Sequence, residues 1–411
     1  MSKLQIDNFK TELADVSRVL IPGGGKLTSL MDATHRRDQW GPIGKGSCGY
    51  SNVVLDGDGK AWCWGSNLYG QLGQNNMGTN YNSPVSVFGN HTFAGVYGGH
   101  YKNMGIKENG ELWIWGYNGS GILGDNSYPG KSQEMTPISV HGGHIFAKAV
   151  AGLTNAMALD TNGHCWCWGR NGYGQLGQNN YSVFEENDKY TPTSVIGGHI
   201  FVDIAIGTCT SYGLKEDGSC WAWGSNENQN LGLGITDAKV MTPMIVSGGH
   251  SFVTINGGNG NDAVVAIKEN GEFWGWGYNI NGVLGLGDNL SRTVPTLMNH
   301  VDIHLFVQAD LGYNFGIGLK DDGSTWCWGS NLYGQLGNGV TIGTGSTNSP
   351  VSVLGNHSFV QIKAGAVTCC AAKTNGEVWS WGMGTAGGLG NGFDLNSNVP
   401  VQVVKTFPVK V

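Results

Sequence analysis

Histidine is the first residue type in this sequence whose recurrence could indicate metal chemistry. Five histidines occur about once per 50 residues: His91, His144, His199, His250 and His357. Imidazole is a common zinc ligand, but a zinc site needs its ligands within about 2 Å of one ion. Each histidine belongs to a different sequence repeat, so the symmetry of a repeat fold would hold them far apart. We therefore expect turn and hydrogen-bonding roles for these side chains, and no metal site.

Tryptophan could act as a stacking platform for sugars or bases. The motif Trp-x-Trp-Gly occurs seven times, and its first tryptophans are Trp62, Trp113, Trp166, Trp221, Trp274, Trp326 and Trp379. On a strand, residues two apart point to the same face. Packing between neighbouring repeats explains all seven copies at once, whereas a ligand site rarely needs seven. We therefore expect a core role for the tryptophans.

Three further patterns carry no catalytic or cofactor signature. The glycine runs at 23–25 and 257–260 lack the following Lys-Ser/Thr of a phosphate loop. The pairs at 125–126 and 288–289 offer too few oxygen ligands for calcium. No nucleophile-elbow pattern is present. The sequence thus predicts no catalytic residues, no metal and no cofactor, and no small-molecule ligand is expected.

The elements that position these residues are short strands. In the last full repeat we expect strands at 350–353, 359–362, 368–373 and 377–381, with an Asn-Gly pair before the last of them. An Asn-Gly or Asp-Gly pair recurs at this place in every repeat and is typical of a two-residue hairpin. Four antiparallel strands per repeat describe the blade of a propeller.

The fold predicted from these repeats is an all-β, closed seven-bladed propeller over residues 41–411. Only one strand, at 50–55, precedes the first tryptophan motif. Strands within residues 399–411 copy the start of a repeat. We therefore expect the C-terminal strands at 399–411 to complete the first blade and close the ring, which would protect its edge strands.

The string Trp-Cys-Trp-Gly-Ser-Asn-Leu-Tyr-Gly-Gln-Leu-Gly at 62–73 resembles the signature of the regulator-of-chromosome-condensation repeat family. Nearly the same string recurs at 166–177 and 326–337, and the resemblance covers residues 41–411. It implies a seven-bladed propeller that binds partners through a face or rim. Members of the family exchange nucleotide on the Ran GTPase, sense UV-B in plants, or inhibit β-lactamase. The Gly-Trp-Arg-His-Thr motif of the photoreceptor is absent here.

One class of loop varies in length and is the candidate partner-binding surface. The distance from the leucine of each Leu-Gly pair to the proline of the next strand ranges from 11 to 16 residues. Length variation on a rigid scaffold is where binding specificity usually resides. The candidate residues lie in the two longest loops: Tyr181, Phe184, Glu185, Glu186, Asp188, Lys189, Tyr190, Tyr128, Lys131 and Met135. The alternative is that these loops only cover blade edges.

Residues 1–40 lie outside the repeats and form a predicted arm. An apolar stripe in this arm predicts a short helix capped by Asp7, and its members are Phe9, Leu13, Val16 and Leu20. The helix could plug the propeller or anchor it to another protein. Segment 8–18 resembles the openings of contractile-phage tail proteins.

Composition narrows the partners and the compartment. The chain holds 23 Lys and Arg against 30 Asp and Glu, a net charge of −7 without basic clusters, so nucleic acid is not an expected partner. No apolar run is long enough for a membrane span, so membrane insertion is not expected. Nine cysteines without a CxxC pair, and an N-terminus without a signal-peptide core, predict free thiols and synthesis in the cytoplasm.

These observations predict a non-catalytic propeller that binds protein partners within a larger assembly. The most concrete version is a virion component such as a phage tail or surface protein. One alternative is a regulator of a small GTPase that acts by nucleotide exchange. The other is an enzyme with a site in the central channel.

Overall fold

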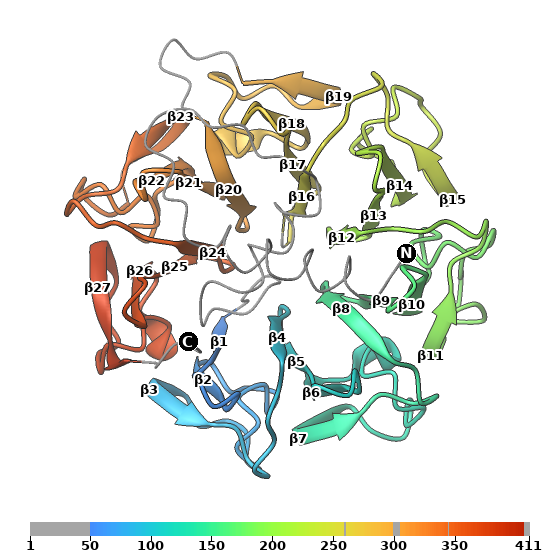
Figure 1. Cartoon of the computed structure of the whole chain (residues 1–411), viewed down its shortest axis with the longest axis horizontal. Helices are drawn as coiled ribbons and strands as arrows, with labels where there is room; N and C mark the ends of the chain where they lie inside the picture. Colours follow the sequence, from blue (N-terminus) through green and yellow to red (C-terminus); the bar gives the residue numbers. More distant parts are fainter. Residues whose placement is uncertain (1–49, 259, 299–304, 344, 407–411) are drawn as a thin grey trace, which may run out of the picture.

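Seven β-sheets surround a common axis in the computed structural model, which describes residues 50–258, 260–298, 305–343 and 345–406 (Figure 1). Every strand pairing within a sheet is antiparallel, and six of the seven described sheets have four strands. The predicted all-β, seven-bladed propeller is therefore confirmed.

The strands of each blade run from the axis to the rim in chain order. Blade 1 contains β1 (Ser51–Leu55), β2 (Ala61–Gly65) and β3 (Tyr81–Ser86). Blade 2 contains β4 (Gly95–Gly98), β5 (Lys102–Ile106), β6 (Leu112–Tyr117) and β7 (Gln133–Ser139), and blade 3 contains β8 (Phe146–Ala151), β9 (Asn155–Asp160), β10 (Cys165–Gly169) and β11 (Lys189–Ser194). Blade 4 contains β12 (Asp203–Ile206), β13 (Thr210–Leu214), β14 (Cys220–Ser225) and β15 (Lys239–Ile245).

The remaining three blades repeat this order. Blade 5 contains β16 (Thr254–Gly257), β17 (Ala263–Ile267), β18 (Phe273–Gly277) and β19 (Arg292–Leu297). Blade 6 contains β20 (Phe306–Leu311), β21 (Phe315–Lys320), β22 (Thr325–Ser330) and β23 (Ser346–Ser352), and blade 7 contains β24 (Gln361–Ala364), β25 (Thr368–Ala372), β26 (Glu377–Gly382) and β27 (Ser397–Thr406). Short 3-10 turns occur at Gly119–Gly121, Ile280–Gly282 and Thr385–Gly387.

The grouping of strands into blades differs from the sequence prediction by one strand. We expected the C-terminal strands at 399–411 to complete the first blade, but β27 pairs with β26 in the last blade, for example Ser380 with Val401. The reason is that the strand after each tryptophan strand folds back and pairs with the free edge of that tryptophan strand. Every sequence repeat therefore begins with the rim strand of the preceding blade. Residues 407–411 lie outside the described residues.

The hairpins between the second and third strands also differ from the prediction. In blade 1, whose equivalent hairpin joins β1 to β2, the amide of Gly59 donates to the Asp56 carbonyl at 3.0 Å, and the Asp56 amide donates to the Lys60 carbonyl at 3.0 Å. Only the glycine has a positive φ, 77°. This pattern is a type I turn followed by a left-handed glycine, which makes a three-residue loop rather than the predicted two-residue turn.

The second tryptophan of every motif is fully buried between blades. The seven residues have 0% exposure: Trp64, Trp115, Trp168, Trp223, Trp276, Trp328 and Trp381. Five of these indoles donate to a carbonyl of the preceding blade at 2.7–3.1 Å, as Trp115 does to Gln71. The predicted packing between neighbouring blades is confirmed for this tryptophan. The first tryptophan of each motif is only half-buried.

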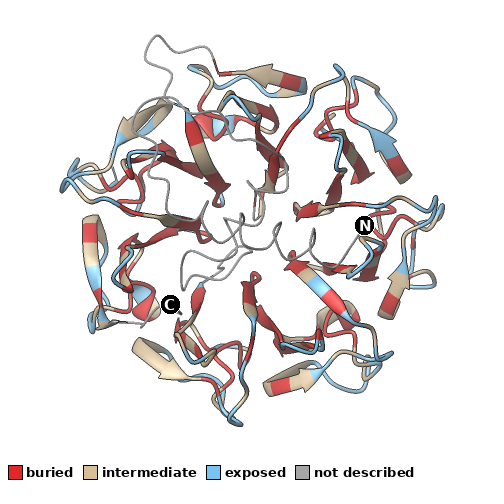
Figure 2. Cartoon of the chain, viewed as in Figure 1, coloured by how far each residue is buried: buried red, intermediate tan, exposed pale blue. Residues whose placement is uncertain are grey.

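Among the strands of each blade the rim strand is the most exposed, whereas the axial strands are mostly buried (Figure 2). Each rim strand contains a proline: Pro84, Pro137, Pro192, Pro243, Pro295, Pro350 and Pro400. Proline cannot donate to a neighbouring strand and is confined to sheet edges. These prolines therefore protect the outer edges of the blades from pairing with other chains.

The axial strands are joined to one another by side chains. Lys363 of β24 lies 2.8 Å from Asp310 of β20, and both side chains are at least 90% buried. The same carboxylate accepts from the Ala364 amide at 2.8 Å. Between blades 2 and 3, Lys102 donates to the Gly152 carbonyl at 2.7 Å, and burial lowers the pKa of this lysine to about 7. Charged groups near the axis thus hold neighbouring blades together.

Candidate functional site

The variable loops and the connections between first and second strands emerge on one side of the propeller. Because antiparallel strands alternate in direction, alternate connections share a face. We name this side the loop face: it carries the connections from third to fourth strand and from first to second strand. The other side, the hairpin face, carries the glycine turns and the connections between blades.

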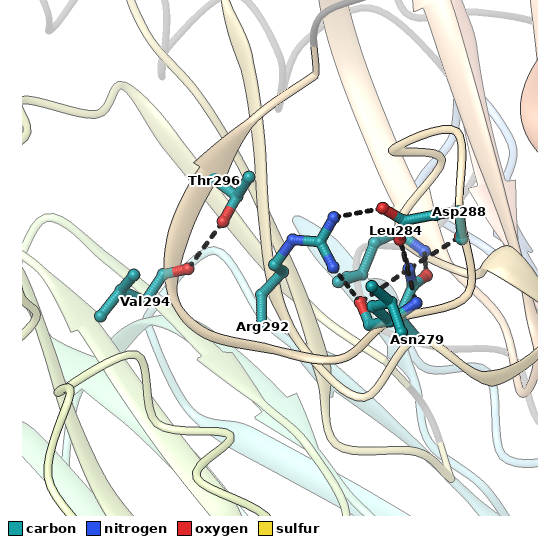
Figure 3. Close-up of polar contacts among 7 residues, drawn as sticks. Asn279, Leu284, Asp288, Arg292, Val294 and Thr296 are labelled. Atoms are coloured by element: carbon teal, nitrogen blue, oxygen red, sulfur yellow. Dashed lines mark hydrogen bonds and ion pairs between the residues drawn. The ribbon is translucent and has the colours of Figure 1, made fainter.

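A buried asparagine organises six of the seven variable loops, as Figure 3 shows for blade 5. The Asn279 side chain accepts from the Leu284 amide at 2.9 Å and donates to the carbonyls of Asp288 and Leu290, each at 3.0 Å. The Asp288 carboxylate then pairs with Arg292 at 2.7 Å. The hydrogen bonds with Arg292 hold the pKa of Asp288 below its usual range. One side chain therefore fixes both ends of the loop.

The same asparagine occurs in six blades, two residues after the glycine of the tryptophan motif: Asn67, Asn118, Asn171, Asn226, Asn279 and Asn331. In each of them the side-chain oxygen accepts from the amide five residues later at 2.9–3.2 Å. Blade 7 has Gly384 at this place instead. This asparagine was not predicted from the sequence, although its fixed distance from the tryptophan motif is a signal that could have identified it.

The longest variable loop joins β10 to β11 and contains five of the ten predicted binding residues. Tyr181 and Phe184 are exposed, at 40% and 89%, and Glu185 and Glu186 are exposed beside them. Asp188 is buried instead, at 8%, because it accepts from the Asn171 amide at 2.8 Å. Asp188 therefore supports the loop and is not part of its surface.

The loop between β6 and β7 contacts both the longest loop and β11, the strand that follows it. The ring of Tyr128 packs against Tyr190 with centroids 5.0 Å apart, and its hydroxyl lies 3.4 Å from Glu185. Lys131 is exposed and pairs with Glu134 at 2.5 Å. The structure thus brings the two predicted loops together.

The remaining two predicted residues lie in rim strands. Met135 belongs to β7 and packs toward the loop of blade 1, where a Cβ on Gly70 would come within 2.9 Å of it. Lys189 begins β11, pairs with Gly169, and is half-buried.

A tyrosine cluster on the loop face was not predicted. Tyr69 lies 5.0 Å from Tyr101 and 4.9 Å from Tyr117 between ring centroids. Tyr50 stacks on Tyr101 at 6.0 Å. These rings come from four separate segments of blades 1 and 2, so no sequence pattern could have grouped them. Partial burial of Tyr101, and then the nearby tyrosines of the cluster, raises the pKa of its hydroxyl.

The five recurring histidines lie on the hairpin face, where the ring of each packs at a tilt of 41–46° against a first tryptophan of the motif. The centroid distances range from 4.0 Å for His144 on Trp166 to 4.5 Å for His91 on Trp113. Partial burial, and then the nearby Lys107, lowers the pKa of His91. Among the described residues, no group of three or more potential ligands could hold a metal ion.

The remaining sequence predictions concern the N-terminal arm, membrane insertion and the cysteines. The predicted arm helix with Phe9, Leu13, Val16 and Leu20 lies outside the described residues. Within the described ranges, no helix has the length and hydropathy needed to span a bilayer. The eight cysteines in those ranges are free thiols.

Comparison with known protein families and sequences agrees with this architecture. A profile described as regulator of chromosome condensation (RCC1) repeat matches residues 58–106, 162–211, 217–265, 270–319, 322–372 and 375–411. The chain is 28% identical over 365 residues to the ultraviolet-B receptor UVR8 of Arabidopsis thaliana, covering 86% of this chain and 80% of UVR8. It is 27% identical over 344 residues to human E3 ubiquitin-protein ligase HERC2, covering 82% of this chain but 7% of HERC2.

Solved structures show the same fold. Yeast RCC1 (Prp20), in its complex with Kap60, superposes with a TM-score of 0.76 at 19% identity, covering 95% of this chain and 90% of Prp20. Human WBSCR16 superposes with a TM-score of 0.75 at 19% identity, covering 84% of this chain and 95% of WBSCR16. Because the repeat profile matches more than half of its residues, the chain belongs to the regulator of chromosome condensation (RCC1) repeat family.

Proposed function

We propose that this chain is a non-catalytic, protein-binding propeller that engages its partner through the loop face. The observation that carries the proposal is the placement of exposed apolar side chains. The five most exposed large hydrophobic residues of the described chain all lie in connections between third and fourth strands: Phe184 (89%), Leu395 (73%), Leu290 (68%), Phe393 (64%) and Val183 (62%). Exposed apolar groups on a rigid scaffold are typical of interaction sites.

The hairpin face also exposes apolar side chains, but several of them pack on the turns. A Cβ on Gly110 would lie 2.4 Å from Ile145, and one on Gly163 would lie 2.8 Å from Ile200. These residues cover the hairpin glycines and so have a structural role. The contrast favours the loop face as the binding surface. The structures of yeast Prp20 with Kap60, and the binding of Prp20p to Gsp1p and histones, provide support from the same fold.

The proposal is tested by site-specific photo-crosslinking of the full chain in cells of its source. A benzoylphenylalanine probe replaces Tyr181 on the loop face in one variant and Ile145 on the hairpin face in another. We expect a discrete protein adduct from position 181 and none from position 145. Adducts from position 145 alone would place the interaction on the other face and overturn the proposal.

Regulation of a small GTPase by nucleotide exchange is a second candidate. It is supported by the fold shared with Prp20p, which is described as binding Gsp1p. The test is the release of fluorescent GDP from Gsp1p in the presence of catalytic amounts of the chain. Acceleration of at least about tenfold, a change of about 1.4 kcal/mol in the activation barrier, would favour this candidate over the non-catalytic proposal.

The virion interpretation depends on segment 8–18, which lies outside the described residues. The relatives named above come from human, plant and yeast and lend it no support.

A further inference from the structure

The tip of the loop between β10 and β11 presents an unusual pair of side chains. Phe184 is 89% exposed and the adjacent Val183 is 62% exposed. Phe184 is the most exposed large hydrophobic residue among those described. A phenylalanine held in water gives up the favourable free energy that burial of its ring would provide. The fold therefore leaves this energy available for binding.

The tip is held in one conformation by its own carboxylate. Glu186 accepts hydrogen bonds from the amides of Val183 at 2.9 Å and Phe184 at 2.7 Å. These backbone hydrogen bonds hold the pKa of Glu186 below its usual range. A turn fixed in this way loses little conformational entropy when a partner binds.

The base of the loop is fixed to blade 3 by buried polar contacts. Ser182 donates to Asp188 at 2.6 Å and accepts from the Asn187 amide at 3.0 Å. Asp188 and the Ser182 amide both bond to the backbone of Asn171, at 2.8 and 2.9 Å. The exposed tip is thus rigidly connected to the propeller.

Aromatic side chains flank the tip on both sides. Tyr181 carries the ammonium of Lys239 over its ring at 3.9 Å. On the other side, Tyr128 packs on Tyr190 and reaches Glu185. Aromatic residues around a central anchor are typical of interface hot spots.

The surroundings of the tip are acidic. The connections β6–β7, β10–β11 and β14–β15, with the first two residues of the rim strands that follow them, contain four cations: Arg170, Lys131, Lys189 and Lys239. The same segments contain seven carboxylates, of which only Asp188 is buried: Asp125, Glu134, Glu185, Glu186, Asp188, Glu227 and Asp237. A partner surface of opposite sign would be attracted to this side of the loop face.

We propose that Val183 and Phe184 form an anchoring prong that inserts into an apolar pocket of a protein partner, and that basic side chains rim this pocket. The inference rests on the proposed protein-binding function and specifies the part of the loop face that binds most strongly. It differs from a general face contact because one residue should dominate the affinity.

The first experiment places the photo-crosslinking probe at position 184 of the full chain. Phe393 of blade 7 provides the matched control, because it is also an exposed phenylalanine at the tip of a variable loop. We expect a protein adduct from position 184 whose crosslinked peptide lies in an apolar pocket flanked by Lys or Arg. Position 393 should give none. An adduct removed by nuclease would instead indicate nucleic acid and overturn the proposal.

The second experiment measures the affinity of the crosslinked protein for purified variants. Phe184→Ala should weaken binding at least about 30-fold, the size of a hot-spot residue, while Phe393→Ala should change it less than about twofold. Both variants should unfold at the same temperature as the unmodified chain. Glu185→Lys should slow association and reduce its dependence on salt.

The outcomes separate this inference from the proposed function. If position 181 captures a partner and Phe184→Ala binds it normally, the prong is wrong and the loop face stands. If only position 145 captures a protein, or no position does, the proposed function itself fails.

Discussion

Gly390 lies directly against the indole of Trp64 and thereby joins the last blade to the first. A Cβ on Gly390 would come within 2.7 Å of the indole Nε1. The equivalent glycine of every other blade has the same relation to the next buried tryptophan, from Gly73 with Trp115 to Gly337 with Trp381. Ring closure therefore uses the same contact as the six internal blade junctions.

Substitution Gly390→Ala should loosen this closure. The added methyl group overlaps the indole and also occupies a φ of 63°, so we expect unfolding free energy to fall by about 2–4 kcal/mol. Gly78→Ala is the matched control, since Gly78 also has a positive φ, 81°, but nothing lies within 4 Å of its added Cβ. Urea unfolding of both variants measures the difference. Equal losses would show that the backbone angle alone, and not the contact with Trp64, matters.

Removal of the buried cation near the axis should be costly. Lys363→Met leaves the Asp310 carboxylate buried without its ion-pair partner, so we expect a loss of about 3–5 kcal/mol in unfolding free energy. Lys131→Met removes an exposed pair with Glu134 and should cost less than about 1 kcal/mol. Adding Asp310→Asn to Lys363→Met should recover part of the loss. If the double variant is no more stable than the single one, the uncompensated charge is not the cause.

Stability should fall as the medium is acidified through the range in which histidine titrates. Partial burial, and then nearby lysines, lowers the pKa of four hairpin-face histidines: His91, His199, His250 and His357. The unfolded chain therefore binds protons first as the pH falls below about 6.5, and the unfolding free energy decreases from that pH downward. Above this pH the histidines contribute no such loss.

The pH effect can be assigned to one site. His199→Phe keeps an aromatic ring over Trp221 and should reduce the slope of unfolding free energy between about pH 5.5 and 7. Lys215→Met should reduce it less, because partial burial of His199 is the larger cause and remains. An unchanged slope in His199→Phe would rule out this histidine as a contributor.

The asparagine at the centre of a variable loop should control local order. Asn279→Ala leaves the Leu284 amide and the Asp288 carbonyl without this partner, while the Leu290 carbonyl still accepts from Arg292, so we expect a loss of about 2–3 kcal/mol. Hydrogen exchange at the Leu284 amide should accelerate. Asn289→Ala, at an exposed neighbouring position, is the control and should leave both quantities unchanged. Protection of Leu284 in the Asn279→Ala variant would contradict this role.

The sequence predicted individual strands better than their grouping. In the last repeat, the tryptophan strand at 377–381 and the strand before it at 368–373 were predicted nearly to the residue. Alternation of apolar residues and the glycine turn between the strands are local signals. The membership of β27 in blade 7 was missed because the offset between repeat and blade depends on which strand edge is free. The period of the sequence repeat does not show which strand forms hydrogen bonds along that edge.

The residues of the candidate site were likewise predicted only in part. Loop length alone marked Phe184 and Tyr128, and the structure brings their loops together. Loop length could not show that Asp188 is buried under the loop. An aspartate can either accept a hydrogen bond from a buried backbone amide or face solvent, and its position in the loop sequence does not distinguish the two. The cluster around Tyr101 could not be found, since its members lie far apart in the sequence.

The sequence by itself determined the number of blades, the tryptophan strand of each repeat and the proline in the strand that follows it. These features follow from residue type and spacing, which act within one repeat. Only the tertiary structure decided which loop residues are exposed, which aromatic rings meet, and how the last blade joins the first. Those features depend on contacts between repeats, where packing and the partnering of buried polar groups select one arrangement among many that share the same period.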